Sequence, residues 1–153
     1  MHPADEANYR RSGKGGRLIP VQDGEEIELG NRKLRIIHLP GHTPGSIAVL
    51  DISRRILISG DPIQEHGRIF MFGEHRDMRV YIDSLERLET MTAGFDEIWP
   101  SHADFPVYPD CIGRLRDGAR RILNHEIDGK AAEFFGQHIV VYDLGFTGFL
   151  YDQ

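Results

Sequence analysis

Three short segments of this chain each place a side chain that can bind a metal directly after an apolar stretch. They are residues 41–46 (Gly-His-Thr-Pro-Gly-Ser), 59–61 (Ser-Gly-Asp) and 100–104 (Pro-Ser-His-Ala-Asp). Two imidazoles and one carboxylate form a ligand set that suits zinc or a similar divalent ion. A fold that uses this set must bring three strand ends together, and strand ends are where ligand sites of layered α/β proteins commonly gather.

Taken singly, each of these side chains also has an ordinary structural interpretation. His42 lies in a glycine-rich turn, where a histidine is commonly a surface residue. Asp61 follows the apolar run 56–58 and precedes a proline, so it could simply cap a loop. His102 follows a strand, a proline and a small residue, as His42 does. The repeated context favours a shared site over three unrelated surface residues.

The first half of the chain predicts two pairs of β-strands, at residues 26–29 with 32–39 and at residues 47–52 with 56–59. Gly30 and Asn31 join the first pair, and both tolerate the positive φ of a two-residue hairpin turn. The apolar run 56–58 lacks alternation, which predicts a strand that is covered on both faces.

Helical spacing begins at about residue 79, with Asp77 as the N-cap and Gly94 at the C-terminal end. Residues 95–99 predict a short strand. A second helix is predicted from Pro109 to about Asp128, where Gly129 stops it. Residues 139–142 and 149–151 predict either a terminal hairpin or an edge strand with an extension. This order of elements predicts a layered α/β (α+β) fold.

Length and composition set further limits. At 153 residues and 40% hydrophobic content, the chain suits a single domain, residues 1–153. No apolar run approaches the roughly 18 residues of a membrane helix, and the polar N-terminus has no signal-peptide core, so we expect a cytoplasmic protein without a membrane partner. The net charge of −6 argues against nucleic acid as a binding partner.

The single cysteine, Cys111, cannot form a disulfide within the chain, and we interpret it as a small packed residue. Residues 11–17 are interpreted as a flexible loop without phosphate binding.

The three segments, in this order and spacing, closely resemble those of the metallo-β-lactamase-fold hydrolases, which include glyoxalase II-like thioesterases, lactonases and β-lactamases. The resemblance is strong over residues 34–106 and looser on either side. It implies an αββα sandwich and a zinc-activated water that attacks an ester, thioester, lactone or amide-type bond of a small-molecule substrate. It further implies that His42 ligates one zinc ion, His102 a second, and Asp61 bridges both as a catalytic residue. The chain has Ser-His-Ala at residues 101–103, where the family usually has Gly-His-Gly.

Members of this family also carry an upstream His-x-His-x-Asp-His segment that supplies the other metal ligands. No two of the eight histidines of this chain are separated by a single residue, so the segment is absent. The resemblance therefore implies the C-terminal portion of the sandwich, with an incomplete ligand set and little zinc binding or activity in the chain alone. Two alternatives remain: a hydrolase whose site other residues complete, or a truncated or degenerate domain that acts as a binding or assembly module. In both alternatives, a homo-oligomer could cover the exposed surface of the sheet.

The residues between the metal-competent segments predict a pocket wall. The segment 70–72 (Phe-Met-Phe) is interpreted as a loop bordering a substrate pocket, together with Phe105, although core packing is expected for at least two of these four residues. His66 and His75 flank this loop and are interpreted as surface histidines.

Overall fold

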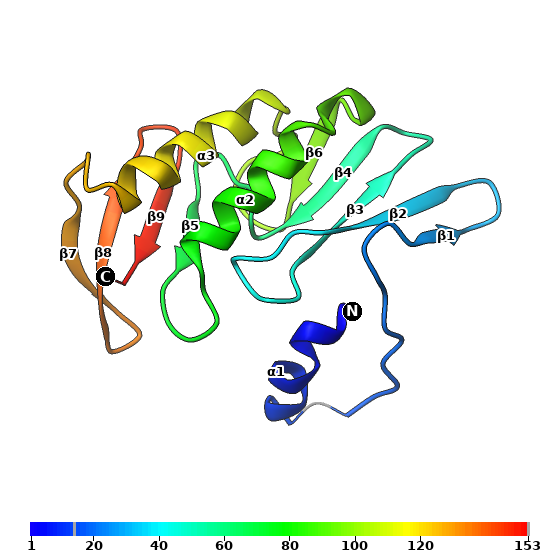
Figure 1. The fold of residues 1–153 in the computed structure, drawn as a ribbon, viewed down its shortest axis with the longest axis horizontal. Helices are drawn as coiled ribbons and strands as arrows, with labels where there is room; N and C mark the ends of the chain where they lie inside the picture. The colour runs from blue at the N-terminus through cyan, green and yellow to red at the C-terminus, as the bar shows by residue number, and fades with distance from the viewer. Residues whose placement is uncertain (14, 153) are drawn as a thin grey trace.

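Two β-sheets and three α-helices form the fold of the computed structural model, which describes residues 1–13 and 15–152 (Figure 1). The first sheet has the strand order β1 (Glu26–Glu28), β2 (Lys33–His38), β3 (Ile47–Asp51), β4 (Ile56–Gly60) and β6 (Glu97–Pro100). The second has the order β5 (Arg68–Met71), β9 (Gly148–Tyr151), β8 (Gln137–Asp143) and β7 (Lys130–Phe134). The helices are α1 (Glu6–Arg11), α2 (Met78–Glu89) and α3 (Asp110–Leu123), with short 3-10 turns at Pro3–Asp5 and Thr92–Gly94.

The two predicted strand pairs of the first sheet are confirmed. Strands β1 and β2 pair antiparallel around Gly30, whose φ of 76° is the positive value expected of a tight turn. The amide of Leu29 donates to the carbonyl of Arg32 across this turn, at 2.8 Å. Strands β3 and β4 pair antiparallel as well, and β6 adds to β4 in parallel. Short connections and local hydrophobic patterns therefore determine most of this sheet.

Both predicted helices exist, but each ends earlier than expected. Asp77 caps α2 as predicted, because its carboxylate accepts hydrogen bonds from the amides of Arg79 and Val80. The helix stops at Glu89, and Gly94 instead ends a separate 3-10 turn. Helix α3 ends at Leu123 rather than near residue 128, since His125 takes the left-handed φ of 54° that we had assigned to a later glycine.

The second sheet is largely unpredicted. The terminal strands β8 and β9 pair antiparallel as expected, but β7 extends this pair on one side and β5 on the other. The segment 70–72 is therefore not a loop throughout: Phe70 and Met71 belong to strand β5, which lies parallel to β9. Helix α1 is a further element that the sequence did not reveal.

Helices α2 and α3 lie side by side along one side of both sheets, and α1 lies apart from them near the N-terminus (Figure 1). Their apolar faces bury Tyr81, Leu85, Ile112 and Leu115 against a core that both sheets share. The opposite face of the first sheet is more open. Ile58 is 43% exposed there, so the prediction that strand β4 is covered on both faces is wrong.

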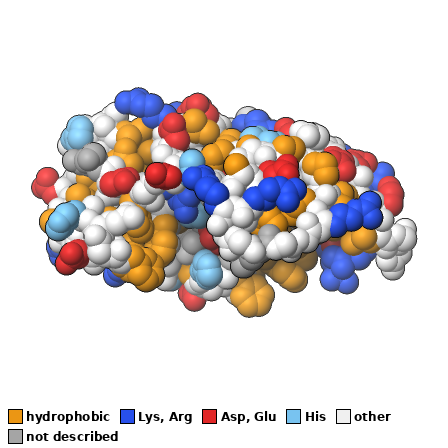
Figure 2. Space-filling view, turned by 90° about the horizontal axis from the view of Figure 1, so that it is seen from below, with side chains coloured by type: hydrophobic (Ala, Val, Ile, Leu, Met, Phe, Trp, Pro, Cys, Tyr) orange, Lys and Arg blue, Asp and Glu red, His pale blue; other side chains and the backbone are white. Residues whose placement is uncertain are grey.

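The surface of the molecule carries both hydrophobic and charged side chains. On the face seen in Figure 2, hydrophobic side chains form patches between charged ones. None of the helices in the described part of the chain is both long and apolar enough to cross a membrane. Lys14, the centre of the glycine-rich segment 11–17, lies outside the described residues.

Candidate functional site

The edge of the first sheet brings the three metal-competent segments together. Strands β4 and β6 are parallel neighbours, so Asp61 and His102 leave the sheet at the same edge. The amide of Ser101 donates to the carbonyl of Gly60 at 3.2 Å, which ties the two strand ends together. The loop between β2 and β3 emerges at this edge too, and it carries His42. A parallel strand pair beside an antiparallel hairpin thus produces the juxtaposition that the sequence predicts.

Contacts from three directions hold the His42 loop. The backbone of Gly41 lies against Tyr81 of α2, and its φ of +122° is a conformation that favours glycine. The carbonyl of Gly41 accepts a hydrogen bond from the amide of Asp77, at 2.9 Å. On the other side, the carboxylate of Asp5 accepts from the hydroxyl of Thr43 at 2.5 Å and from the amide of Gly45 at 2.8 Å. The loop is therefore a fixed support for His42.

The carboxylate of Asp61 lies between the two imidazoles. Its Oδ2 is 3.5 Å from Nε2 of His42, and its Oδ1 is 3.5 Å from Nε2 of His102. The His42 side chain is 11% exposed, whereas those of Asp61 and His102 are 41% and 68% exposed. The cluster thus runs from the protein interior to the surface, with one carboxylate oxygen facing each ring. Whether these residues bind metal stays a prediction.

The hydrogen bonding of His42 determines which of its nitrogens is free. Its Nδ1 lies 2.8 Å from the carbonyl oxygen of Phe70, which can only accept, so Nδ1 carries the proton. Burial lowers the pKa of His42 and the nearby Arg76 lowers it further, against the opposing effect of Asp61. The ring is therefore neutral near pH 7, and its Nε2 lone pair faces a carboxylate oxygen that is also an acceptor. A cation between these two atoms would satisfy both.

This lowered pKa predicts how stability depends on pH. Below the ordinary histidine value of 6.5, the unfolded chain takes up a proton at residue 42 that the folded protein resists. We therefore expect the free energy of unfolding of the metal-free protein to fall as the pH decreases below 6.5. Urea unfolding at a series of pH values measures this slope. His42→Gln should weaken the slope, whereas His138→Gln, a change at an exposed residue, should keep it; equal slopes in His42→Gln and wild type would contradict the assignment.

The cluster does not form a complete metal site. Within residues 1–13 and 15–152, no group of three or more histidine, cysteine, aspartate or glutamate side chains is arranged to hold a metal ion. The three predicted residues fit zinc in donor type, because imidazole nitrogens and carboxylate oxygens are common zinc ligands. They do not converge on one ion. Zinc binding by this chain therefore stays a prediction.

The other histidines named in the sequence analysis do not complete the cluster. His66 is exposed, and its Nδ1 lies 3.0 Å from the carboxylate of Asp104. His75 is exposed as well and lies beside Arg11. Cys111 is fully buried, and burial raises the pKa of its thiol to about 12, which agrees with a packed residue rather than a nucleophile.

A cleft of about 580 Å³ opens beside the cluster. His42, Asp61 and His102 line it together with residues from both sheets and from the loops between them: Gln64, His66, Arg68, Phe70, Arg76 and Phe134. Phe70 is the one residue of the predicted pocket wall that lines this cleft. Met71 is buried in the core, Phe72 packs against Phe70 and Phe134, and Phe105 packs against Trp99 with its own surface exposed.

Four further residues of this cleft were not predicted from the sequence: Gln64, Arg68, Arg76 and Phe134. Gln64 follows Asp61 by three positions, and its side chain donates to the main-chain carbonyl of Asp61 at 2.9 Å. Arg76 directly precedes the helix cap Asp77, a position that could have drawn attention to it. Phe134 belongs to the unpredicted strand β7, so no local signal placed it at the cleft.

Comparisons with known proteins show the family of the chain. A sequence model of the metallo-β-lactamase superfamily matches residues 1–95. The acyl-coenzyme A thioesterase MBLAC2 from Bos taurus is 37% identical over 86 residues, which cover 55% of this chain and 30% of that protein. The hydroxyacylglutathione hydrolase GloC from Haemophilus influenzae is 37% identical over 46 residues, which cover 30% of this chain and 22% of that protein. The chain thus matches less than a third of the length of either relative.

Solved structures show the same fold. A metallo-β-lactamase from Pontibacter korlensis superposes with a TM-score of 0.67 at 14% identity, over 78% of this chain and 56% of that one. The protein ETHE1 from Myxococcus xanthus superposes with a TM-score of 0.55 at 19% identity, over 72% of this chain and 53% of that one. The expected fold class is therefore confirmed.

Proposed function

The chain belongs to the metallo-β-lactamase superfamily, and on that premise we propose that it is a zinc-dependent hydrolase of acyl thioesters. The choice of a thioester rests on relatives that are named as an acyl-coenzyme A thioesterase and a hydroxyacylglutathione hydrolase. The chain matches less than a third of the length of either relative, so the thioesterase activity is proposed for this chain and is not carried over from them.

One observation carries the proposal: the carboxylate of Asp61 lies within 3.5 Å of both His42 Nε2 and His102 Nε2, and all three side chains line one cleft. Imidazole nitrogens and carboxylate oxygens are common ligands of a divalent cation such as zinc. In this proposal His42 and His102 each donate a nitrogen to zinc and Asp61 donates oxygen. Zinc bound there would lower the pKa of water and polarise a carbonyl group.

The residues of the chain divide the remaining tasks. The hydrogen bond from His42 Nδ1 to the carbonyl of Phe70 keeps the proton off Nε2 and fixes the ring orientation. Asp61 orients the attacking water by accepting a hydrogen bond from it. Phe70 and Phe134, whose rings pack edge to face at 5.2 Å, offer an apolar wall for the acyl group. The oxygen of water adds to the acyl carbon, the carbon–sulfur bond breaks, and the thiol leaves with a proton.

A hydrolysis assay with and without zinc tests this function. We expect slow turnover of acetyl-coenzyme A by the zinc-loaded protein, and loss of that turnover after chelation, because the described residues supply only part of the ligand set that holds zinc tightly. Release of the thiol can be followed with a chromogenic disulfide reagent, with nitrocefin hydrolysis as a comparison for β-lactam bonds. Equal turnover before and after chelation would contradict zinc dependence. Absence of turnover at saturating zinc would favour the alternative of a non-catalytic binding or assembly module.

A further inference from the structure

Arg76 differs from the other partly buried arginines in lacking an ion-pair partner. Among the described residues, four arginines are partly buried, and three of them pair with a carboxylate: Arg32 with Asp51, Arg35 with Glu26, and Arg116 with Glu89. Arg76 lies within 4.0 Å of no described carboxylate, and its Nε is buried without a hydrogen-bond partner. A buried donor of this kind is unfavourable unless an acceptor replaces the water that it has lost.

Arg76 lines the same cleft as the Asp61 cluster. Burial lowers the pKa of its guanidinium, and the more distant carboxylates of Asp5 and Asp61 oppose this effect. Neither carboxylate lies within 4.0 Å of the Arg76 guanidinium, and that of Asp5 accepts its hydrogen bonds from Thr43 and Gly45 of the His42 loop. The acceptor that Arg76 lacks is therefore not supplied by either of them.

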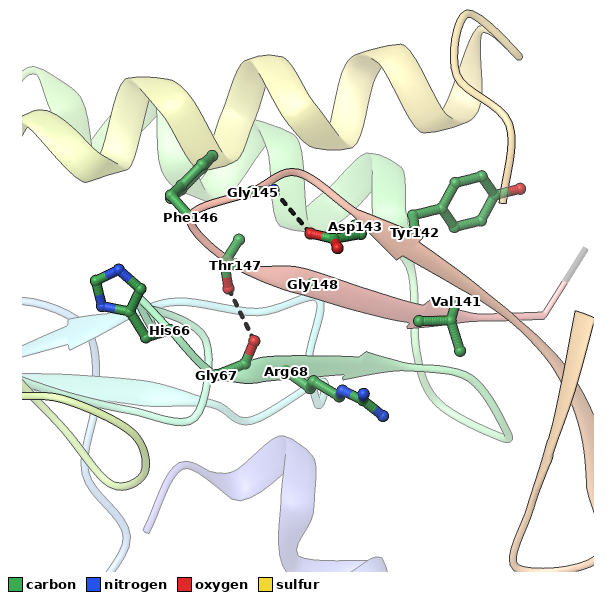
Figure 3. A pocket seen from close by; sticks show the side chains of 10 residues that line it. All are labelled: His66, Gly67, Arg68, Val141, Tyr142, Asp143, Gly145, Phe146, Thr147 and Gly148. Carbon is green, nitrogen blue, oxygen red and sulfur yellow. Dashed lines mark hydrogen bonds between the residues drawn. The ribbon is translucent and has the colours of Figure 1, made fainter. Parts of the chain in front are cut away.

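A second arginine, Arg68, adds to the positive charge of the cleft. It is exposed and forms no ion pair with any described residue. Arg68 also lines an adjoining hollow of about 200 Å³, and Figure 3 shows that its side chain points away from the turn between β8 and β9. The carboxylate in that turn, Asp143, accepts a hydrogen bond from the amide of Gly145 at 2.8 Å. It is thus held within the turn.

The charges of the cleft therefore favour an anion. Two arginines and one carboxylate are among the residues that line it, although the chain as a whole carries a net charge of −6. The planar guanidinium fork matches the two oxygens of a carboxylate or a phosphate. The apolar wall formed by Phe70 and Phe134 lines the same cleft, so one ligand could contact both.

We propose that Arg76, assisted by Arg68, binds an anionic group of the substrate and thereby selects acyl thioesters that carry a carboxylate or a phosphate. This inference rests on the proposed thioesterase function for the identity of the substrate, but the anion site itself exists independently of catalysis. The anion could belong to the acyl part, as in a dicarboxylic acid, or to the thiol part, as in coenzyme A.

Calorimetric titration of the metal-free protein tests the site without any catalytic step. The probes are coenzyme A, which carries phosphates, succinate, which carries carboxylates, and pantetheine, which is neutral. We expect at least one anion to bind more tightly than pantetheine, with an affinity that falls as salt increases. Arg76→Gln should weaken that binding by about tenfold, and Arg76→Lys should restore part of it.

The matched control is Arg79→Gln. Arg79 lies three residues further along, is exposed, forms no ion pair with a described residue and does not line the cleft. Its replacement should change anion affinity by less than about twofold. Circular dichroism melting verifies that each variant is folded.

The outcomes separate this proposal from the proposed function. Loss of coenzyme A binding alone in Arg76→Gln would identify the thiol part as the source of the anion, and loss of succinate binding alone would identify the acyl part. Equal binding by Arg76→Gln and wild type, or no preference for either anion over pantetheine, would overturn the anion site. Anion binding that depends on Arg76 without thioester hydrolysis would uphold the site and reject the proposed reaction.

Discussion

Gly41→Ala is expected to destabilise the protein by about 3 kcal/mol or more, since overpacking and backbone strain act together. A Cβ at this position would lie 2.4 Å from the Cα of Tyr81, and backbone atoms of helix α2 cannot move aside as a flexible side chain can. The backbone φ of +122° at Gly41 adds strain for any residue with a side chain. The variant should also displace the adjacent His42, so it should lose activity as well as stability.

Gly30→Ala is the matched control for this prediction. Gly30 also has a positive φ, of 76°, but a Cβ there would have no neighbour within 4 Å. Its replacement should therefore cost only the backbone strain, about 1 kcal/mol. Urea unfolding followed by circular dichroism measures both variants. Similar losses in the two would show that contact with α2 does not restrict residue 41, and would contradict the assigned support of the His42 loop.

Local signals explain why much of the first sheet and both long helices could be predicted. The turn at Gly30 and the cap at Asp77 act within a few residues, so the sequence pattern contains the necessary information. Helix ends were less predictable. Helix α3 ends six residues before Gly129, because Asn124 caps it and His125 adopts the left-handed conformation itself.

Pairing between distant segments explains what the sequence could not reveal. Strand β5 pairs with β9, roughly 80 residues later, and nothing near Phe70 indicates that partner. Strand β7 is almost entirely exposed, with alanines at 131 and 132, so it has neither alternation nor strong β-propensity. The cleft residues Arg68, Phe70 and Phe134 come from these two strands, and this is why the pocket was only partly foreseen.

The cluster itself was predicted because each member follows a strand in a recognisable segment. The structure adds that Asp61 lies between His42 and His102, with 3.5 Å to each ring. It also supplies the tautomer of His42, which depends on the carbonyl of Phe70 in the second sheet. No sequence pattern near residue 42 could have indicated that contact.

Asp61→Asn is expected to lower zinc-dependent thioester hydrolysis by about 100-fold, because in the proposed function this carboxylate both binds zinc and orients the attacking water. Asparagine has nearly the same shape, and the hydrogen bond from Gln64 goes to the main-chain carbonyl of residue 61, so the loop should keep its conformation. The substitution therefore removes the negative charge between His42 and His102 but keeps the hydrogen bond from Gln64 that holds the loop at residue 61.

Asp104→Asn is the matched control, since Asp104 also contacts a histidine. Its carboxylate lies 3.0 Å from Nδ1 of His66, and both side chains are exposed. A pair of this kind contributes little in water, so hydrolysis by Asp104→Asn should stay within about twofold of wild type. Equal losses in the two variants would indicate a general effect of removing negative charge from this region.

Zinc titration of the wild type, Asp61→Asn and Asp104→Asn by calorimetry measures metal binding by the His42, Asp61 and His102 cluster without any assumption about the substrate. We expect weak zinc binding by the wild type, a loss of affinity of about 10- to 100-fold in Asp61→Asn, and no change in Asp104→Asn. The same zinc affinity in Asp61→Asn as in the wild type would contradict a role of Asp61 as a zinc ligand.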